Sequence, residues 1–433
     1  MYTGLVLAAL VTAVPQWTLE RCIERGLQEG IELQRQELLL RQRRGDERFA
    51  LLDGLPEISL RTGCDFGWGR TVDMQELTIV DHRLNLSNSW SVGASLSSAR
   101  VVSSFLDKRD RRFLREEAAA GREAMETGLK IAITEAYLEL LLADKNYENA
   151  CAGYESILAQ KERTEKEVRS GRLSYRSLAE IEAQSATEKA AVASARGKRR
   201  TAAMNLSRYL NLSPEEELSV APPADDSLPE PWPMPSEGDI ARYLAAHPRI
   251  RQAEAVLGSS RAGLRKERAS LLPDLTVAGG YGTYYSNTSR MTWYNQITGN
   301  GNPSLGVTLT IPLPGGQSFS RLRQRTSEVA RQECEIEGIR QELESEMLSS
   351  LLDAINCYES CLAAEENMKA LGTAFRANEA RFENGAISSS EYLISRTNWQ
   401  QAVGAYWQAR YRYLFQLKII SLRKIPVQEG GSQ

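Results

Sequence analysis

The sequence predicts a mainly α-helical fold with a small β portion, in which one structural plan is used twice along 433 residues. Three observations predict this fold. Short segments recur in the same order in the two halves of the chain, two very long segments have the heptad periodicity of coiled coils, and four short segments alternate apolar and polar residues. Together they indicate duplicated long helical hairpins, each accompanied by a pair of β-strands.

Three matches between the halves support the duplication. Leu-Pro-Glu at 55–57 matches Leu-Pro-Asp at 272–274, the segment 90–97 matches 303–310, and a turn at Gly171 matches one at Gly385, with a nearly constant offset. Each half therefore contains a helix, two strands, a long helix, a tight turn and a last helix. We predict helices over 17–53, 108–168 and 175–211 with strands over 55–69 and 84–98, then helices over 237–271, 318–383 and 389–424 with strands over 272–285 and 303–313.

The repeats define the domain organisation. We expect a signal peptide over 1–13, because an apolar run of this length is typical of a secretory signal and is too short to cross a membrane as a helix. The first repeat is 14–211, the second is 237–424, and 425–433 is a short flexible tail. Many of the prolines lie in 212–236, which argues against a helix there and predicts a linker.

The two longest helices, 108–168 and 318–383, are predicted to extend about 90–100 Å at a rise of 1.5 Å per residue. Helices of this length require coiled-coil partners. Apolar residues recur every seven positions in the first of them, with a second set interleaved: Leu129, Ala136, Ala143, Ala150 and Ile157, then Ile133, Leu140, Tyr147 and Tyr154. This periodicity predicts that the helix packs against its neighbours along most of its length.

The predicted strands alternate with a period of two. Small polar residues or glycines alternate with apolar residues such as Ile58 and Leu60, Val92 and Leu96, and Val307. Strands of about ten residues with this alternation are typical of transmembrane β-strands. Four strands cannot close a barrel, and no apolar helix face remains to cover them, so the sequence predicts an oligomer.

Aromatic residues gather near the strand ends, as in the interfacial girdle of a membrane protein. The candidate membrane-interface residues are Trp68, Trp90, Tyr281, Tyr284, Tyr285, Trp293 and Tyr294.

Composition excludes several functions. A mean hydropathy of −0.39 excludes a helical membrane protein, and a net charge of −3 argues against a nucleic-acid partner. The histidines, His82 in the predicted loop between the first strands and His247 beside Pro248, have no spacing typical of a catalytic triad or metal site. We predict no enzyme activity, cofactor or bound metal, and we interpret the six cysteines as small packing residues.

With these features, the chain resembles the TolC-type outer membrane efflux proteins, over about 17–424. The resemblance implies a homotrimer in the Gram-negative outer membrane. Each chain would contribute four strands to one 12-stranded barrel in the outer-membrane lipid and its helices to a periplasmic tunnel. It also implies a passive exit duct of a tripartite efflux or type I secretion-like system, with a periplasmic adaptor and an inner-membrane transporter as partners.

The resemblance also assigns roles to the hairpin tips. The turns at Gly171 and Gly385 would form the periplasmic tip, with Leu173 and Ile387 as candidate adaptor contacts. In the family, acidic residues of the second tip ring the pore, and Glu391 matches the first of these positions. Ile394 occupies the second, which leaves one acidic ring as the predicted gate. A helix-capping role for Glu391, in the turn after Ser388, is an equally good interpretation.

One alternative from another class stays open at the level of sequence. A soluble periplasmic coiled-coil adaptor or scaffold would also contain long helical hairpins. An adaptor should show one hairpin flanked by small β-domains, whereas this chain has two hairpins and amphipathic strands.

Overall fold

The structure is a computed structural model that describes residues 17–72, 78–172, 174–213, 218–223, 228–289, 291–384 and 386–425. The predicted signal peptide and the tail beyond residue 425 lie outside these residues. The chain divides into two compact units. The hairpin unit comprises Met1–Glu37, Gly121–Pro248 and Ile339–Gln433, and the sheet unit comprises Leu38–Ala120 and Arg249–Gly338.

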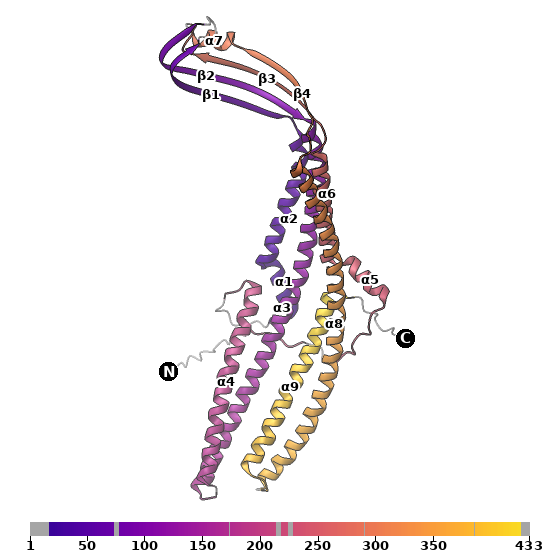
Figure 1. Cartoon of the computed structure of the whole chain (residues 1–433). Coiled ribbons are helices and arrows are strands. Elements are labelled where there is room, and N and C mark those ends of the chain that lie inside the picture. Colours follow the sequence, from indigo (N-terminus) through magenta and orange to yellow (C-terminus); the bar gives the residue numbers. More distant parts are fainter. Residues whose placement is uncertain are drawn as a thin grey trace, which may run out of the picture. The chain divides into compact units, whose positions relative to one another are not determined.

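The order of elements is the duplicated one that the sequence predicts (Figure 1). The first repeat contains α1 (Leu19–Glu29), α2 (Ile31–Phe49), the 3-10 helix η1 (Ala50–Gly54), β1 (Glu57–Val72), β2 (Ile79–Ser97), α3 (Ser98–Arg169) and α4 (Tyr175–Leu210). The second contains α5 (Glu237–Ala246), α6 (Pro248–Ala269), β3 (Asp274–Ser286), α7 (Trp293–Gly299), β4 (Asn302–Thr310), α8 (Gly316–Glu383) and α9 (Ser389–Leu422). The prediction of a mainly helical fold with long duplicated hairpins is confirmed.

The structure corrects several predicted elements. The first predicted helix is interrupted at Gly30, and the helix predicted over 237–271 is interrupted at His247, whose backbone is extended because Pro248 follows it. Helix α3 begins at Ser98, ten residues before the predicted start. The prediction that His82 lies in a loop is wrong, because it pairs with Gly69 within β2.

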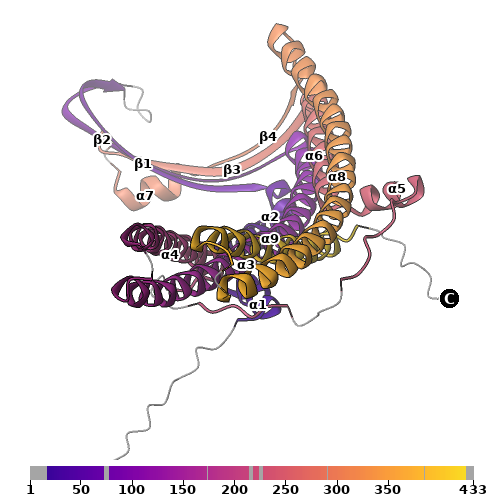
Figure 2. The same ribbon diagram turned by 90° about the horizontal axis from the view of Figure 1, so that it is seen from below.

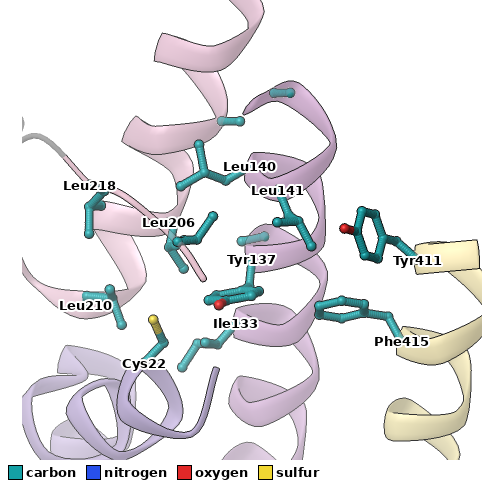
Figure 3. Packing of buried hydrophobic residues seen from close by; sticks show 14 of the residues in the cluster. Cys22, Ile133, Tyr137, Leu140, Leu141, Leu206, Leu210, Leu218, Tyr411 and Phe415 are labelled. Carbon is teal, nitrogen blue, oxygen red and sulfur yellow. The ribbon is translucent and has the colours of Figure 1, made fainter. Parts of the chain in front are cut away.

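In the hairpin unit, α3 and α4 form one antiparallel pair and α8 and α9 form the other (Figure 2). Of the nine predicted heptad residues of α3, Tyr147, Ala150 and Tyr154 are half-buried and the others are buried. Ile133 and Leu140 are fully buried, and Leu129 and Ala136 nearly so. They pack with Leu206 and residues of α1 and α9 in one apolar cluster (Figure 3). This burial confirms the coiled-coil interpretation of the heptad pattern.

Two tyrosines connect the Pro-rich linker to the helices of the hairpin unit. The hydroxyl of Tyr137 in α3 donates to the carbonyl oxygen of Ala221 at 2.5 Å, and that of Tyr413 in α9 donates to Pro229 at 2.5 Å. Burial raises the pKa of both phenols, that of Tyr413 to about 12. One tyrosine in each repeat thus fixes a different part of the linker.

The cysteines are free thiols rather than disulfides among the described residues. Cys22 is fully buried in the cluster of Figure 3, and burial raises its pKa to about 12. Because the thiolate is the reactive form, this cysteine is chemically inert and acts as a small packing residue.

Candidate functional site

The four strands form one antiparallel sheet in the order β1-β2-β3-β4. The register places the apolar residues of all four strands on the same face: Leu60 pairs with Val92 and Val92 with Tyr281, while Leu96 pairs with Val277 and Val277 with Val307. These side chains are exposed in the single chain, with Leu60 at 72% and Val307 at 66%. The sheet therefore presents a continuous apolar face to its surroundings.

The opposite face carries small polar residues and glycines. One row across the sheet runs from Ser59 through Gly93 and Gly280 to Ser304. A Cβ atom on Gly280 would approach the carbonyl oxygen of Val92 to 3.1 Å, so the glycine allows close packing of β3 against β2. One face is thus suited to apolar surroundings and the other to water.

Both edges of the sheet lack a neighbouring strand within the described chain, since β1 and β4 each pair on one side only. Unpaired edges present rows of backbone N–H and C=O groups that can pair with another strand. The edges are long, with 16 residues in β1 and 9 in β4.

The predicted interface aromatics lie in four different settings. Tyr281 and Tyr285 are on the apolar face of β3, but the alternation places Tyr284 on the polar face. Trp68 is 77% exposed at a register shift between Gly67 and Gly69. Trp90 is partly exposed on β2, with its indole N–H donating to Asn88.

Trp293 and Tyr294 belong to α7, a short helix that the sequence did not predict, at the end of the sheet away from α3 and α6 (Figure 1). Gln296, a residue of α7, is almost fully buried, and its side chain joins α7 to β3. The side-chain oxygen accepts from the Ser286 N–H at 2.8 Å, and the side-chain N–H donates to the Ser286 carbonyl at 2.9 Å. Trp293 and Tyr294 remain 51% and 69% exposed.

Asp274, the acid of the second Leu-Pro-Asp motif, connects the sheet to α3. One carboxylate oxygen accepts from the Ser97 hydroxyl at 2.7 Å, the Ser98 hydroxyl at 3.0 Å and the Ala99 N–H at 2.8 Å. Asp274 thus accepts hydrogen bonds from groups at the start of α3, which is a capping role, although it lies on a strand of the other repeat. The sequence signals that could have indicated this contact are the Leu-Pro-Asp motif and the two serines.

The acid of the first motif makes a different contact. Glu57 forms an ion pair with Arg100 in the first turns of α3. Asp274 of the second motif instead accepts from hydroxyl and backbone donors. The two Leu-Pro-acid motifs thus both fasten a strand start to the same helix.

The hairpin tips are partly described. Gly171 adopts a left-handed conformation with φ of +74°, which a glycine reaches without strain, and ends α3. Leu173 and Gly385, two of the predicted tip residues, lie outside the described residues. Ile387 is half-buried in the second turn, and Ile394, on the first turns of α9, is 61% exposed.

Glu391 caps the start of α9. Its N–H donates to the Ser388 hydroxyl at 3.3 Å, and its carboxylate accepts from the Ser388 N–H at 3.4 Å, which together form a capping box. The capping interpretation of Glu391 is therefore observed. The carboxylate is exposed, and its role as a gate stays a prediction.

Two features are absent among the described residues. Within 17–425, apart from the gaps given above, there is no group of three or more His, Cys, Asp or Glu side chains arranged to hold a metal ion. Over the same residues no helix is both long and apolar enough to cross a membrane.

Comparison with known proteins identifies the fold. Residues 240–422 match the family model "Outer membrane efflux protein". The structure superposes on the Campylobacter jejuni CmeC outer membrane channel with a TM-score of 0.81 at 14% identity, covering 94% of this chain and 85% of that one. For the open state of the Neisseria gonorrhoeae MtrE channel the TM-score is 0.75 at 20% identity, covering 94% of this chain and 88% of that one. For the Vibrio cholerae outer membrane protein VceC the TM-score is 0.72 at 16% identity, covering 94% of this chain and 95% of that one. No curated protein matches the chain.

Over 94% of its length, the chain thus has the fold of these outer-membrane channel structures. By sequence, residues 240–422 match the model of the outer membrane efflux proteins, which confirms the predicted resemblance to the TolC-type family.

Proposed function

We propose that this chain is the subunit of an outer-membrane exit duct, a passive conduit for substrates that an inner-membrane pump drives outward through a periplasmic adaptor. The observation that carries the proposal is the sheet, which has one exposed apolar face, one polar face and two unpaired edges. A soluble protein would bury such a face. A lipid-embedded barrel requires it, because apolar residues face the lipid and polar residues face the lumen.

Closure of the barrel requires more than one copy. Four strands are too few to close on themselves, and roughly eight give the smallest interior filled by side chains. The free edges of β1 and β4 allow one copy to pair with the next, so that a homotrimer would supply twelve strands. The channel fold shared with CmeC and MtrE supports this assembly.

The lipid-facing girdle consists of aromatic residues that lie on the apolar face or beside it. Tyr281, Tyr285, Trp90 and Trp68 extend from the strands, and Trp293 extends from α7. Tyr284 is assigned to the lumen side of the rim, because it alternates with Tyr285 along β3. Aromatic side chains at membrane interfaces place an apolar ring in lipid and a polar group in water.

The hairpin tips are proposed to contact the periplasmic adaptor through the turns at Gly171 and Gly385 and the apolar side chains Leu173 and Ile387. In a trimer, three copies of Glu391 would lie around one axis. Their carboxylates would then bind cations and narrow the closed pore. The capping box supports the placement, because it fixes the carboxylate at the first turn of α9 rather than leaving it mobile.

The domain organisation of the duct follows the sequence boundaries. Residues 1–13 are proposed to direct export and to be removed, 14–211 and 237–424 to form the two repeats, 212–236 to lie at the equator of the tunnel, and 425–433 to be a tail. The two tyrosine contacts to the linker support its equatorial position within the hairpin unit.

Fractionation and mass measurement test the duct. The full-length chain, expressed in a Gram-negative host, should be recovered in outer-membrane fractions and should have the mass of a trimer after extraction in mild detergent. Recovery as a soluble periplasmic protein would overturn the proposal in favour of the coiled-coil adaptor or scaffold, which the exposed apolar sheet face disfavours. A monomer in the detergent extract would overturn the barrel-closure argument.

A further inference from the structure

The helices of the sheet unit are basic where they approach the sheet. Helices α2, α3, α6 and α8 all meet the strands at the same end of the sheet (Figure 1). The segments of these helices near that end, 41–48, 100–115, 261–268 and 321–331, hold 18 of the chain's 53 Lys and Arg residues but only 6 of its 56 Asp and Glu residues. Because the whole chain has a net charge of −3, positive charge is concentrated beside the sheet.

A groove of about 610 Å³ lies between α2 and α3 in this basic region. Arg44 and Arg48 line it from α2, where a spacing of four residues places them on one face of the helix. Lys108 and Arg115 line it from α3, where a spacing of seven residues does the same. The volume is within the range of about 300–1,000 Å³ that is usual for small-molecule sites, so the groove has room for a polar headgroup.

Three of the four cations in the groove have no charge partner. The only acid among the residues that line it is Glu47, and Arg115 holds the Glu47 carboxylate at 2.9 Å. Within the described part of the chain, the side chains of Arg44, Arg48 and Lys108 form no ion pair or hydrogen bond, and all three are exposed. Cations gathered around one groove repel one another, so an anion that enters the groove is stabilised by all of them.

Apolar side chains lie between the groove and the sheet. Leu52 comes four residues after Arg48 as the chain approaches β1, and Phe105 comes three residues before Lys108 as α3 leaves β2. Leu52 is 54% exposed and Phe105 is 63% exposed. Moving away from the sheet, apolar side chains are therefore followed by cations, which is also the order of the acyl chains and the phosphate in a phospholipid.

The second repeat shows the same order. Leu272 and Phe319 are 60% and 59% exposed close to the sheet, and Arg268 and Arg323 each lie four residues farther from it. The sequence of apolar residue and cation is thus common to the four helices that meet the sheet. The groove between α2 and α3 is the place where such cations surround an enclosed volume.

We infer that this groove binds the phosphate of an anionic phospholipid, with Arg44, Arg48 and Lys108 around the phosphate and the acyl chains beside Leu52 and Phe105. An arginine guanidinium can donate two parallel hydrogen bonds to phosphate oxygens, which favours phosphate over a simple halide. The inference rests on the proposed membrane position of the sheet, because that position brings phospholipid to the groove. A phosphate-bearing solute would use the same cations without the apolar contacts.

Lipid binding to the detergent-extracted, full-length chain tests the groove. Native mass spectrometry would measure the binding of phosphatidylglycerol, which has a net negative charge, and of phosphatidylcholine, which is zwitterionic. The wild-type chain should bind phosphatidylglycerol more tightly than phosphatidylcholine. The triple variant Arg44→Gln, Arg48→Gln, Lys108→Gln should bind phosphatidylglycerol roughly a hundredfold more weakly, the loss expected for three cations near an anionic surface.

A matched triple variant controls for the loss of charge. Arg163→Gln, Lys198→Gln, Arg200→Gln also removes two arginines and one lysine, at exposed positions of α3 and α4 whose side chains have no partner among the described residues. It should bind phosphatidylglycerol as the wild-type chain does, and equal losses in the two triple variants would overturn the groove.

A second variant fills the groove and keeps every charge. Ala119 lines the groove and is exposed, so a larger side chain at this position can enter the groove without disturbing a core. Ala119→Trp should weaken phosphatidylglycerol binding, and binding that is as tight as in the wild-type chain would overturn the groove.

Inorganic phosphate distinguishes the two sources of the ligand. The lipid assignment is wrong if phosphatidylglycerol binds no better than phosphatidylcholine while inorganic phosphate, compared with chloride at equal ionic strength, protects the wild-type chain but not the groove variant from thermal unfolding. The ligand would then be a phosphate-bearing solute.

The outcomes also separate the groove from the duct. Recovery of the wild-type chain in outer-membrane fractions, together with unchanged phosphatidylglycerol binding in the groove variant, would overturn the groove and leave the duct standing. Recovery as a soluble periplasmic protein would overturn the duct and, with it, the lipid as the source of the phosphate.

Discussion

The two hairpins of the hairpin unit share one design but differ in the contacts that join their helices toward the turn. There α8 and α9 contact through aromatic rings: Phe375 stacks on Trp399 at 5.0 Å with nearly parallel rings, and Phe382 stacks on Tyr392 at 4.6 Å. Between α3 and α4 the apolar cluster around Leu140 and Leu206 is joined by ion pairs, with Arg199 on Asp144 at 2.6 Å and Lys161 on Glu182 at 3.1 Å.

This difference teaches that duplication conserved the length and the turn of the hairpin, whereas the contacts between its two helices changed. Stacked rings resist salt and depend on close packing, whereas partly exposed ion pairs weaken with ionic strength and depend on protonation. The second hairpin is therefore expected to be the stiffer of the two, and the first to be the one that responds to solvent conditions.

The largest effect should come from removing the centre of the aromatic stack. Phe375 is 8% exposed and contacts both Trp399 and Tyr392, so Phe375→Ala should lower the opening free energy of the second hairpin by about 3–5 kcal/mol. Hydrogen exchange of the amides in the last turns of α8 measures it. Leu158→Ala, at a 42% exposed site on α3, is the control and should have little effect. Equal protection in both variants would refute the view that aromatic packing holds this hairpin.

A smaller effect is expected at the half-buried ion pair of the first hairpin. Burial raises the pKa of Asp144, and the hydrogen bond and charge of Arg199 oppose that rise. Arg199→Ala leaves the carboxylate without its donor, which should cost about 1–3 kcal/mol at neutral pH. Hydrogen exchange of α4 amides measures the loss.

The pH dependence of this variant has a definite sign. A carboxyl group whose pKa is higher in the folded than in the unfolded state contributes stability that is fully present below the unfolded pKa and is lost as pH rises through the folded pKa. Arg199→Ala raises the folded pKa further, so its deficit relative to wild type should shrink as the pH falls toward protonation of Asp144. A deficit that is constant from neutral to acidic pH would show that lost packing, not charge, causes it.

The sequence allowed the fold to be predicted wherever periodicity alone decides the structure. The heptads of α3 predicted the buried Ile133 and Leu140, and the alternation of the strands predicted the apolar face with Leu60 and Val307. These patterns are local, because each residue's face follows from its position in one helix or strand.

Features that depend on distant partners were not predictable in this way. Asp274 caps a helix that begins 176 residues earlier in the chain, and Gln296 holds α7 by bonds to the Ser286 backbone. The aromatic stack did leave a trace, since Phe375 and Phe382, like Tyr392 and Trp399, are spaced by seven residues. Which helices those faces meet depends on tertiary packing, which the spacing does not specify.

The third effect concerns the tip of the stiffer hairpin, where two roles of Glu391 can be separated. Glu391→Ala removes both the capping box and the charge and should destabilise the start of α9 by about 0.3–1 kcal/mol. Glu391→Gln keeps a side chain able to accept from the Ser388 N–H but removes the charge. If the carboxylates ring the pore, both variants should show weaker block by divalent cations in reconstituted channels. Block that is unchanged in Glu391→Gln would leave Glu391 as a cap alone.

The smallest effect is expected at the exposed ion pair near the tip of the first hairpin. Lys161 and Glu182 retain 31% and 51% side-chain exposure, so water screens their attraction and the pair adds little to cohesion. Lys161→Ala should speed the exchange of nearby α4 amides only slightly in low salt. In 1 M salt, where the Debye length falls to about 3 Å, the variant and the wild type should exchange alike. The same salt series should leave the amides beside Phe375 unaffected, because ring stacking is not screened. A salt response of equal size in both hairpins would remove the chemical distinction between them.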